Sequence, residues 1–236
     1  MINESQLPTS ISFTQRARDL APELLALCAS SALSIALLAV RMYYTGRITY
    51  VFLAWNLILA WIPLLCAGTA WVISRRRGVL SLPLLPLLAL WLLFFPNSPY
   101  ILTDLLHLAP RDGAPHWYDL VLILSFTWSG LMLGFASLWL VQMMVSDSFG
   151  RLAGWLVVLG TLAAGAFGIY LGRFLRWNSW DIIAQPQALL SDVLTSIASP
   201  FDHPRTLAVT LLLTVFLTIA YVTLTIFTRH RPQIRR

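Results

Sequence analysis

Long runs of apolar residues alternate with short polar connections along this chain. A bilayer core of roughly 30 Å needs about 20 apolar residues in helical conformation. The 236-residue sequence contains six runs of about this length, near residues 20–40, 49–73, 79–95, 117–145, 152–175 and 206–228. The alternation typical of strands is absent, and backbone groups in lipid must be paired within helices. The pattern predicts an all-α polytopic membrane helix bundle with about six transmembrane helices.

Two segments depart from this simple pattern. The third run is the shortest and contains Pro83 and Pro86, so we expect it to be kinked, tilted or partly re-entrant. Between Pro186 and Ser199, apolar residues follow helical spacing while polar residues take the other face, which indicates a helix lying on the membrane surface before the sixth span. No linker or repeat divides the chain, so we predict a single integral membrane domain over 1–236.

Composition agrees with a membrane protein and excludes other classes. Hydrophobic residues make up 58% and charged residues 11%, with a mean hydropathy of +0.75, whereas soluble domains are about a quarter charged. The pI near 9.9 does not indicate nucleic-acid binding, because the arginines lie beside apolar runs. Cys28 and Cys66 both lie inside apolar runs, so neither a disulfide framework nor a thiolate metal site is indicated.

The basic residues predict how the chain is oriented. All 16 are Arg; 10 lie near one face (residues 16, 18, 75–77, 151, 229, 231, 235 and 236) and 6 near the other (residues 41, 47, 111, 173, 176 and 205). The positive-inside rule then predicts that both termini are cytoplasmic. If all six runs span, the third and fifth run in the same direction. The sequences that follow them therefore emerge on one face, predicted to be periplasmic.

The stretch FPNSPYILTDLLHL, residues 95–108, follows the third run directly. Asn97 or Ser98 can cap a helix and Pro99 suits its first position, which predicts a short helix from about 99 to 108. Its polar residues fall at i, i+3, i+4 and i+7 on one line: Tyr100, Thr103, Asp104 and His107. This spacing predicts a narrow hydrogen-bonding edge on an otherwise apolar helix.

The stretch GRFLRWNSWD, residues 172–181, follows the fifth run. If the helix continues through it, four side chains share one side, with Asp181 just beyond: Arg173, Arg176, Trp177 and Trp180. Asn178 or Ser179 can end this helix. Arginine pairs bidentately with carboxylates and phosphates, so this stretch could meet the Asp104 edge or an external anion.

Two interpretations of these stretches are open. In one, Asp104 and an arginine form a structural ion pair, and the tryptophans lie in an interfacial aromatic belt. In the other, Asp104 and His107 transfer protons in a pocket that holds an anionic lipid headgroup or glycosyl phosphate. The candidate ligand-binding residues are Asn97, Tyr100, Thr103, Arg173, Arg176, Trp177, Asn178, Trp180 and Asp181. No cofactor is indicated, and no metal is predicted, because His107 and His116 lack an HExxH-like spacing.

Small and polar residues inside the runs predict helix packing. Gly160, Ala164, Gly168 and Gly172 recur every four residues in the fifth run, as Gly130 and Gly134 do in the fourth, so we expect these two helices to pack closely. For Asn56 in the second run, and for the serines at 30, 31 and 34 in the first, interhelical hydrogen bonds are the ordinary explanation.

Together, PNSPYILTDLLHL and GRFLRWNSWD resemble the signature of a bacterial family of multi-pass membrane proteins, domain of unknown function 1361. The resemblance extends from the second run to the sixth. It implies a bacterial inner-membrane protein with about six spans and supplies no activity. Besides a headgroup-binding protein, transferase or hydrolase, two alternatives stay open: a transporter component, and a membrane scaffold or assembly factor in which these motifs are structural.

Overall fold

The structure is a computed structural model that describes residues 21–79, 81–109, 113–199, 201–202 and 204–229, all of them in helices or short connections. The helices are α2 (Ala21–Thr45), α3 (Val51–Arg77), α4 (Leu84–Phe94), α5 (Asn97–Tyr100), the 3₁₀ helix η2 (Ile101–His107), α6 (His116–Phe149), α7 (Arg151–Phe174), α8 (Asp181–Ala184), α9 (Pro186–Ala198) and α10 (Pro204–Arg229). Several arginines counted for the orientation lie outside the described residues: 16, 18, 111, 231, 235 and 236.

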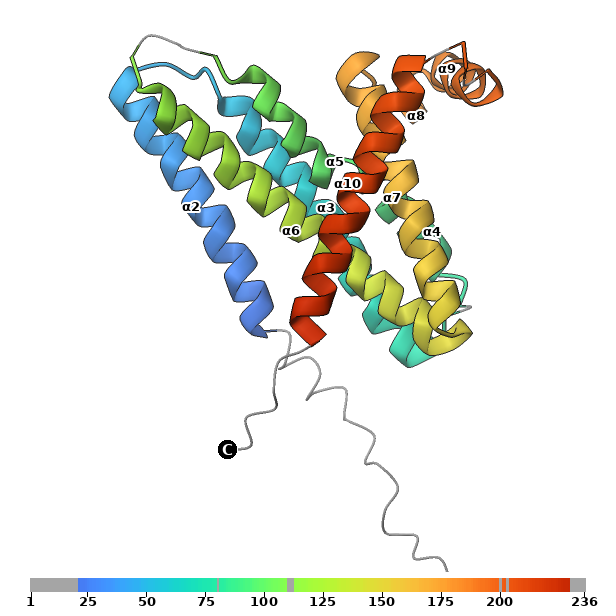
Figure 1. Cartoon of the computed structure of the whole chain (residues 1–236). Helices are drawn as coiled ribbons and strands as arrows, with labels where there is room; N and C mark the ends of the chain where they lie inside the picture. Colours follow the sequence, from blue (N-terminus) through green and yellow to red (C-terminus); the bar gives the residue numbers. More distant parts are fainter. Residues whose placement is uncertain (1–20, 80, 110–112, 200, 203, 230–236) are drawn as a thin grey trace, which may run out of the picture.

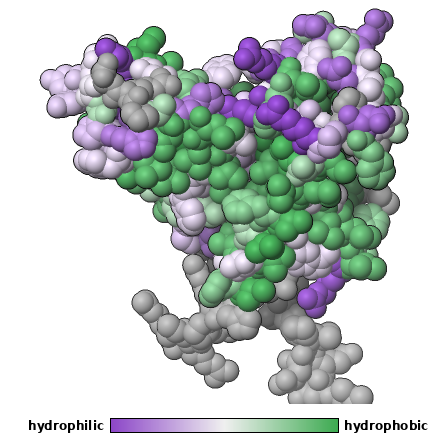
Figure 2. Space-filling view, turned by 45° about the horizontal axis from the view of Figure 1, so that its top comes forward, coloured by the Kyte–Doolittle hydropathy of each residue, from purple (hydrophilic) through white to green (hydrophobic). Residues whose placement is uncertain are grey.

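Six stretches of the described chain are long and apolar enough to cross a membrane, which confirms the predicted multi-pass helical fold. The longest helix, α6, packs against α2, α3 and α7, and α10 packs against α7 (Figure 1). We call the end that carries the α2–α3, η2–α6 and α7–α10 connections the outer end, and the opposite end the inner end. Hydrophobic residues cover the side of the molecule below a polar rim (Figure 2).

The third crossing is a broken helix. α4 has only 11 residues, about 16 Å of helix, which is roughly half of a bilayer core. Only with α5 and η2 does the crossing reach 24 residues, from Leu84 to His107. The third span therefore does not end near residue 95 as predicted, and the polar-striped segment lies within the crossing rather than after it.

Two prolines explain the break. Pro96 and Pro99 have no backbone N–H, so two helical hydrogen bonds are missing between α4 and η2. The predicted capping is wrong, because the chain continues from α4 in helical conformation and no side chain caps α5. From Ile101 the backbone winds as a 3₁₀ helix, not the expected α-helix. In this winding, side chains at i and i+3 eclipse, which stacks Asp104 over His107.

The broken segment is enclosed by three neighbouring helices. Ser98 Oγ donates to the Ala60 carbonyl of α3 at 3.0 Å. A β-carbon at Gly130 of α6 would lie 2.6 Å from the Ser98 carbonyl oxygen, and one at Gly168 of α7 would lie 2.6 Å from Pro96 Cγ. Irregular backbone is tolerated at membrane depth where protein encloses it. These glycines therefore make room for the break.

The glycine prediction is thus only partly correct. Helices α6 and α7 do pack together, as expected. However, their glycines face the α4–α5 break instead of each other, and Gly172 lies against Tyr100. Gly160 and Ala164 of the predicted groove are exposed, and nothing lies within 4 Å of a β-carbon at Gly160. A four-residue spacing shows which face of a helix carries small residues, but it does not show which segment packs against that face.

The predicted surface helix is present as α9, which runs across the direction of the spans at the outer end (Figure 1). Its residues Leu190 and Leu194 are each 56% exposed, which suits a helix with one face in the interfacial region.

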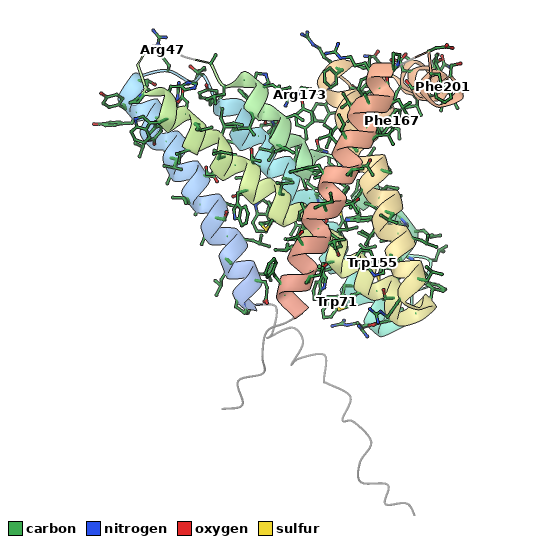
Figure 3. The ribbon with its side chains drawn as sticks, viewed as in Figure 1. Arg47, Trp71, Trp155, Phe167, Arg173 and Phe201 are labelled. Carbon is green, nitrogen blue, oxygen red and sulfur yellow. The ribbon has the colours of Figure 1, made fainter. Side chains whose placement is uncertain are left out.

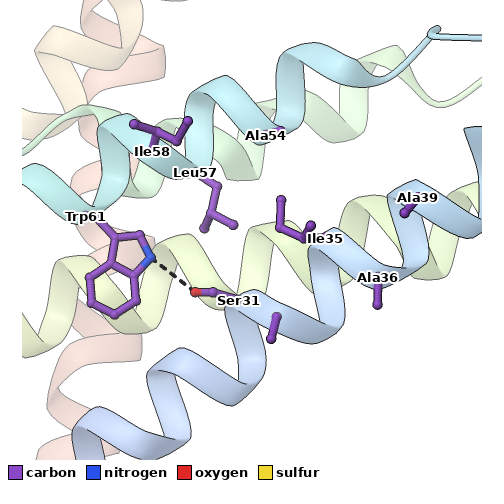
Figure 4. Close-up of a pocket in the computed structure, with 9 residues that line it drawn as sticks. Ser31, Ile35, Ala36, Ala39, Ala54, Leu57, Ile58 and Trp61 are labelled. Carbon is purple, nitrogen blue, oxygen red and sulfur yellow. Dashed lines mark hydrogen bonds between the residues drawn. The ribbon is translucent and has the colours of Figure 1, made fainter.

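The serines of α2 make the expected interhelical bonds. Ser30 and Ser34 both lie within hydrogen-bonding distance of Ser129 in α6, at 2.7 and 3.2 Å between hydroxyl oxygens. Trp61 of α3 donates its indole N–H to Ser31 Oγ at 3.2 Å, at one end of an apolar groove between α2 and α3 (Figure 4). These bonds tie α2 to both of its neighbours.

Candidate functional site

The two sequence motifs meet at the outer end, as the parity of the crossings predicts. Arg173 lies in the last turn of α7 and extends towards the α5–η2 segment (Figure 3). Its Nη2 donates to Asp104 Oδ1, and the two side chains are 12% and 1% exposed. The pair joins the third and fifth crossings through a buried salt bridge.

Three further groups hold the Arg173 guanidinium. Its Nε donates to Thr103 Oγ1 at 2.8 Å, and that hydroxyl donates to the Tyr100 carbonyl at 2.7 Å. Nη1 lies 3.4 Å from His107 Nδ1. The guanidinium carbon lies 4.3 Å from the centre of the Tyr100 ring, in cation–π geometry. All three guanidinium nitrogens therefore have partners, and the planar group is fixed.

Asp104 has a second partner that the sequence did not reveal. Asn56 of α3 donates its amide to Asp104 Oδ2 at 2.8 Å. The interhelical hydrogen bond expected for Asn56 is confirmed, but its partner could not be found from a spacing of 48 residues. We call this set the Asp104 network: Asn56, Tyr100, Thr103, Asp104, His107 and Arg173. Both carboxylate oxygens of Asp104 are occupied within it.

His107 lies at the accessible edge of the network. Its side chain is 43% exposed and its Nδ1 is 3.9 Å from Asp104 Oδ1. The ring also packs against Phe52 of α3, with 5.3 Å between ring centres. Because Arg173 can only donate, the contact at 3.4 Å makes His107 Nδ1 the acceptor, and the neutral ring then carries its proton on Nε2.

The predicted Arg–Trp face does not form, because α7 ends at Phe174. The N–H of Trp177 bonds back to the Leu171 carbonyl at 3.1 Å, which closes the helix end and puts Arg176 in the left-handed conformation at φ +63°. Arg176 is exposed and has no hydrogen bond or salt bridge with any other described residue. Arg173 and Arg176 therefore differ in surroundings: one is enclosed, the other free.

The remaining residues of the second motif support the chain that follows α7. Trp177 donates its indole N–H to Asp192 of α9 at 2.9 Å. The backbone N–H of Asn178 donates to Asp181 Oδ2 at 2.7 Å, which stabilises the turn into α8. Trp180 is 43% exposed. This motif thus divides between the Asp104 network and the α8–α9 segment.

Asn97 connects the two motifs a second time. Its amide donates to Ser179 Oγ at 2.9 Å and to the Phe94 carbonyl at 3.0 Å. The predicted capping role is replaced by this bridge, which holds the turn after α7 against the break after α4.

A second buried ion pair lies at the outer end and was not predicted. Arg41 of α2 donates from Nε and Nη2 to the two oxygens of Asp119 in α6, at 2.6 and 3.0 Å. Both side chains are 1% exposed, and the guanidinium lies 4.5 Å from the Tyr50 ring centre. The residues are 78 positions apart, so only the packing of α2 on α6 brings them together.

Metal ligands do not gather at either ion pair. Within the described part of the chain, no three His, Cys, Asp or Glu side chains lie close enough to hold an ion.

Comparison with protein families matches residues 55–220 to "Protein of unknown function (DUF1361)". The chain belongs to the DUF1361 family. The matched region of this DUF1361 protein contains every residue of the Asp104 network, whereas Arg41 and Tyr50 precede it. Comparison with curated proteins and with solved structures finds no significant match. The DUF1361 chain is therefore a multi-pass helical membrane protein whose family assigns no activity.

Proposed function

We propose that this protein binds an anionic, phosphate-bearing and lipid-like ligand at its outer end, which faces the periplasm in the orientation set by the arginine count. The observation that carries the proposal is Arg176. Its guanidinium is exposed and unpaired among the described residues, and its backbone has a conformation that costs roughly 1 kcal/mol for any residue except glycine. A strained backbone conformation at a residue other than glycine points to a function at that position.

His107 supports binding at the same place. With Nδ1 accepting from Arg173, the neutral ring keeps Nε2–H as a donor, and the side chain is 43% exposed. Arg173 and Arg176 are three positions apart, which limits their Cα separation to about 11 Å. A phosphate bridging His107 and Arg176 would meet two donors.

The geometry favours binding over acid–base catalysis. Asp104 is 1% exposed and both of its oxygens have donors, so it acts here as a positioning group that holds Arg173 and not as a proton carrier. A headgroup transferase or hydrolase would need His107 as a general base, and its Nδ1 already contacts Arg173 Nη1.

The test compares two exposed arginines of the outer end. Binding of short-chain phosphatidic acid to the purified protein in micelles is measured for the wild type, Arg176→Gln and Arg47→Gln. Loss of one charge-assisted contact predicts about tenfold weaker binding for Arg176→Gln, with Arg47→Gln unchanged. His107→Gln should also weaken binding. Equal affinities for both arginine variants would contradict the proposal.

A structural role is the second candidate, favoured by how completely the Asp104 network satisfies itself. Arg173 uses all three nitrogens and Asp104 both oxygens, which suits a lock between crossings in a scaffold protein. In that case Asp104→Asn and Arg173→Gln should couple in stability, and no variant at the outer end should change phosphatidic acid binding.

A further inference from the structure

A second pocket lies at the inner end, between the end of α6 and the start of α7. Its lining residues are Trp139, Gln142, Met143, Ser146, Asp147, Arg151 and Trp155. Figure 3 shows Trp155 at the end of the molecule opposite Arg47 and Arg173. The pocket is therefore separate from the outer site, and its occupancy does not depend on the function proposed for that site.

Gln142 gives this pocket a fixed polar group. The residue is 6% exposed, and its Oε1 accepts from the Tyr221 hydroxyl of α10 at 2.7 Å. Its amide nitrogen has no hydrogen-bond partner among the described residues. A buried amide held at one atom and unpaired at the other presents a donor to whatever occupies the pocket.

The start of α7 adds positive charge. Arg151 is the first residue of the helix and is exposed, and Gly150 before it supplies no capping side chain. The first N–H groups of a helix lack partners within it, and the helix dipole makes this end positive. A cation there is unfavourable unless an anion is nearby. The one carboxylate in the pocket, Asp147, pairs with Arg75 of α3.

The walls indicate a ligand at the membrane boundary. Trp139 is 40% exposed and Trp155 is half-buried, and tryptophan is enriched where headgroups meet acyl chains. We infer that this pocket binds the phosphodiester of an anionic phospholipid, with Arg151, the α7 N-terminus and the Gln142 amide as donors and the tryptophans beside the acyl chains.

The experiment measures lipid retention by the full chain. The protein is placed in nanodiscs of phosphatidylcholine with a minor fraction of phosphatidylglycerol, and the bound lipid is identified by native mass spectrometry after release. We expect the wild type to retain phosphatidylglycerol selectively. Arg151→Gln should reduce retention about tenfold, while Arg77→Gln, a matched exposed arginine outside the pocket, should leave it unchanged.

One further variant and one displacement experiment complete the test. Gln142→Glu replaces the amide donor with a carboxylate and should also reduce retention, with the fold checked by thermal unfolding. Equal losses for Arg151→Gln and Arg77→Gln would show general attraction to the surface and overturn the assignment. Displacement of the lipid by excess inorganic phosphate would show a soluble anion site and overturn the lipid assignment.

Discussion

At the level of single residues, Asp104 is decisive for the outer site. It is a buried carboxylate with a cation on one oxygen and an amide on the other, so its charge is compensated and its lone pairs are used. A buried ion pair adds little net stability over an apolar pair of similar volume. Removing one partner, however, leaves an uncompensated charge and costs several kcal/mol.

Asp104→Asn should therefore destabilise the protein by about 3 kcal/mol, measured by reversible unfolding in micelles. Adding Arg173→Gln should recover at least about 1 kcal/mol of that loss, because the stranded cation is removed. The control is Asp147→Asn, whose ion pair with Arg75 is exposed and should contribute less than about 1 kcal/mol. If Asp104→Asn and Asp147→Asn lost similar amounts of stability, burial of the Asp104 network would have no energetic consequence.

Arg176 tests the link between backbone strain and function. Arg176→Gly should stabilise the protein by about 1 kcal/mol in thermal unfolding, because glycine adopts φ +63° without a steric penalty. Arg176→Ala also removes the charge but keeps the β-carbon, so it should give no such gain. If the alanine variant is as stable as the glycine variant, the left-handed conformation is not strained.

At the level of elements, the broken third crossing positions the Asp104 network. Had Pro96 and Pro99 been ordinary helix formers, an α-helix could have continued to His107 with a different face towards α7. The 3₁₀ winding places Asp104 at 1% exposure and leaves His107, three residues later, at 43%. The small residues of α6 and α7 give the break its space, and Gly172 also lies against Tyr100 of the Asp104 network.

This packing predicts a contrast among alanine substitutions at glycine. Gly130→Ala and Gly168→Ala should each destabilise by about 1–3 kcal/mol, since the new β-carbon would lie 2.6 Å from Ser98 or Pro96 atoms. Gly160→Ala, in the same helix as Gly168, has nothing within 4 Å and should be neutral or stabilising by up to about 1 kcal/mol. Thermal unfolding in one detergent compares all three. If Gly160→Ala lost as much stability as Gly168→Ala, this packing would be contradicted.

Sequence predicted the elements better than their ends and contacts. Hydropathy found the six crossings, and parity brought Asp104 and Arg173 to one end, because both depend on length and direction alone. The end of α7 was missed because Arg176 takes a conformation that usually indicates glycine. Asn56 and the Arg41–Asp119 pair were missed as partners because side chains 48 and 78 positions apart meet only through tertiary packing.

At the level of the whole molecule, the two ends differ in chemistry. The outer end contains both buried Arg–Asp pairs, Arg41 with Asp119 and Arg173 with Asp104. The inner end has exposed arginines at the end of α3 and the start of α7, where only Arg75 forms an ion pair among the described residues. The cytoplasmic inner end itself stays a prediction from the arginine count of the whole sequence, 10 against 6.

Labelling of introduced cysteines tests that orientation. In a chain carrying Cys28→Ser and Cys66→Ala, Arg47→Cys at the outer end should react with a membrane-impermeant maleimide in spheroplasts of the expressing bacterium. Arg76→Cys at the inner end should react only after the membrane is permeabilised, because both positions are exposed and the bilayer alone separates them. The reverse pattern would move the Asp104 network to the cytoplasmic face and the Arg151 pocket to the periplasmic leaflet. The ligand assigned to each end would then have to be sought on the opposite side.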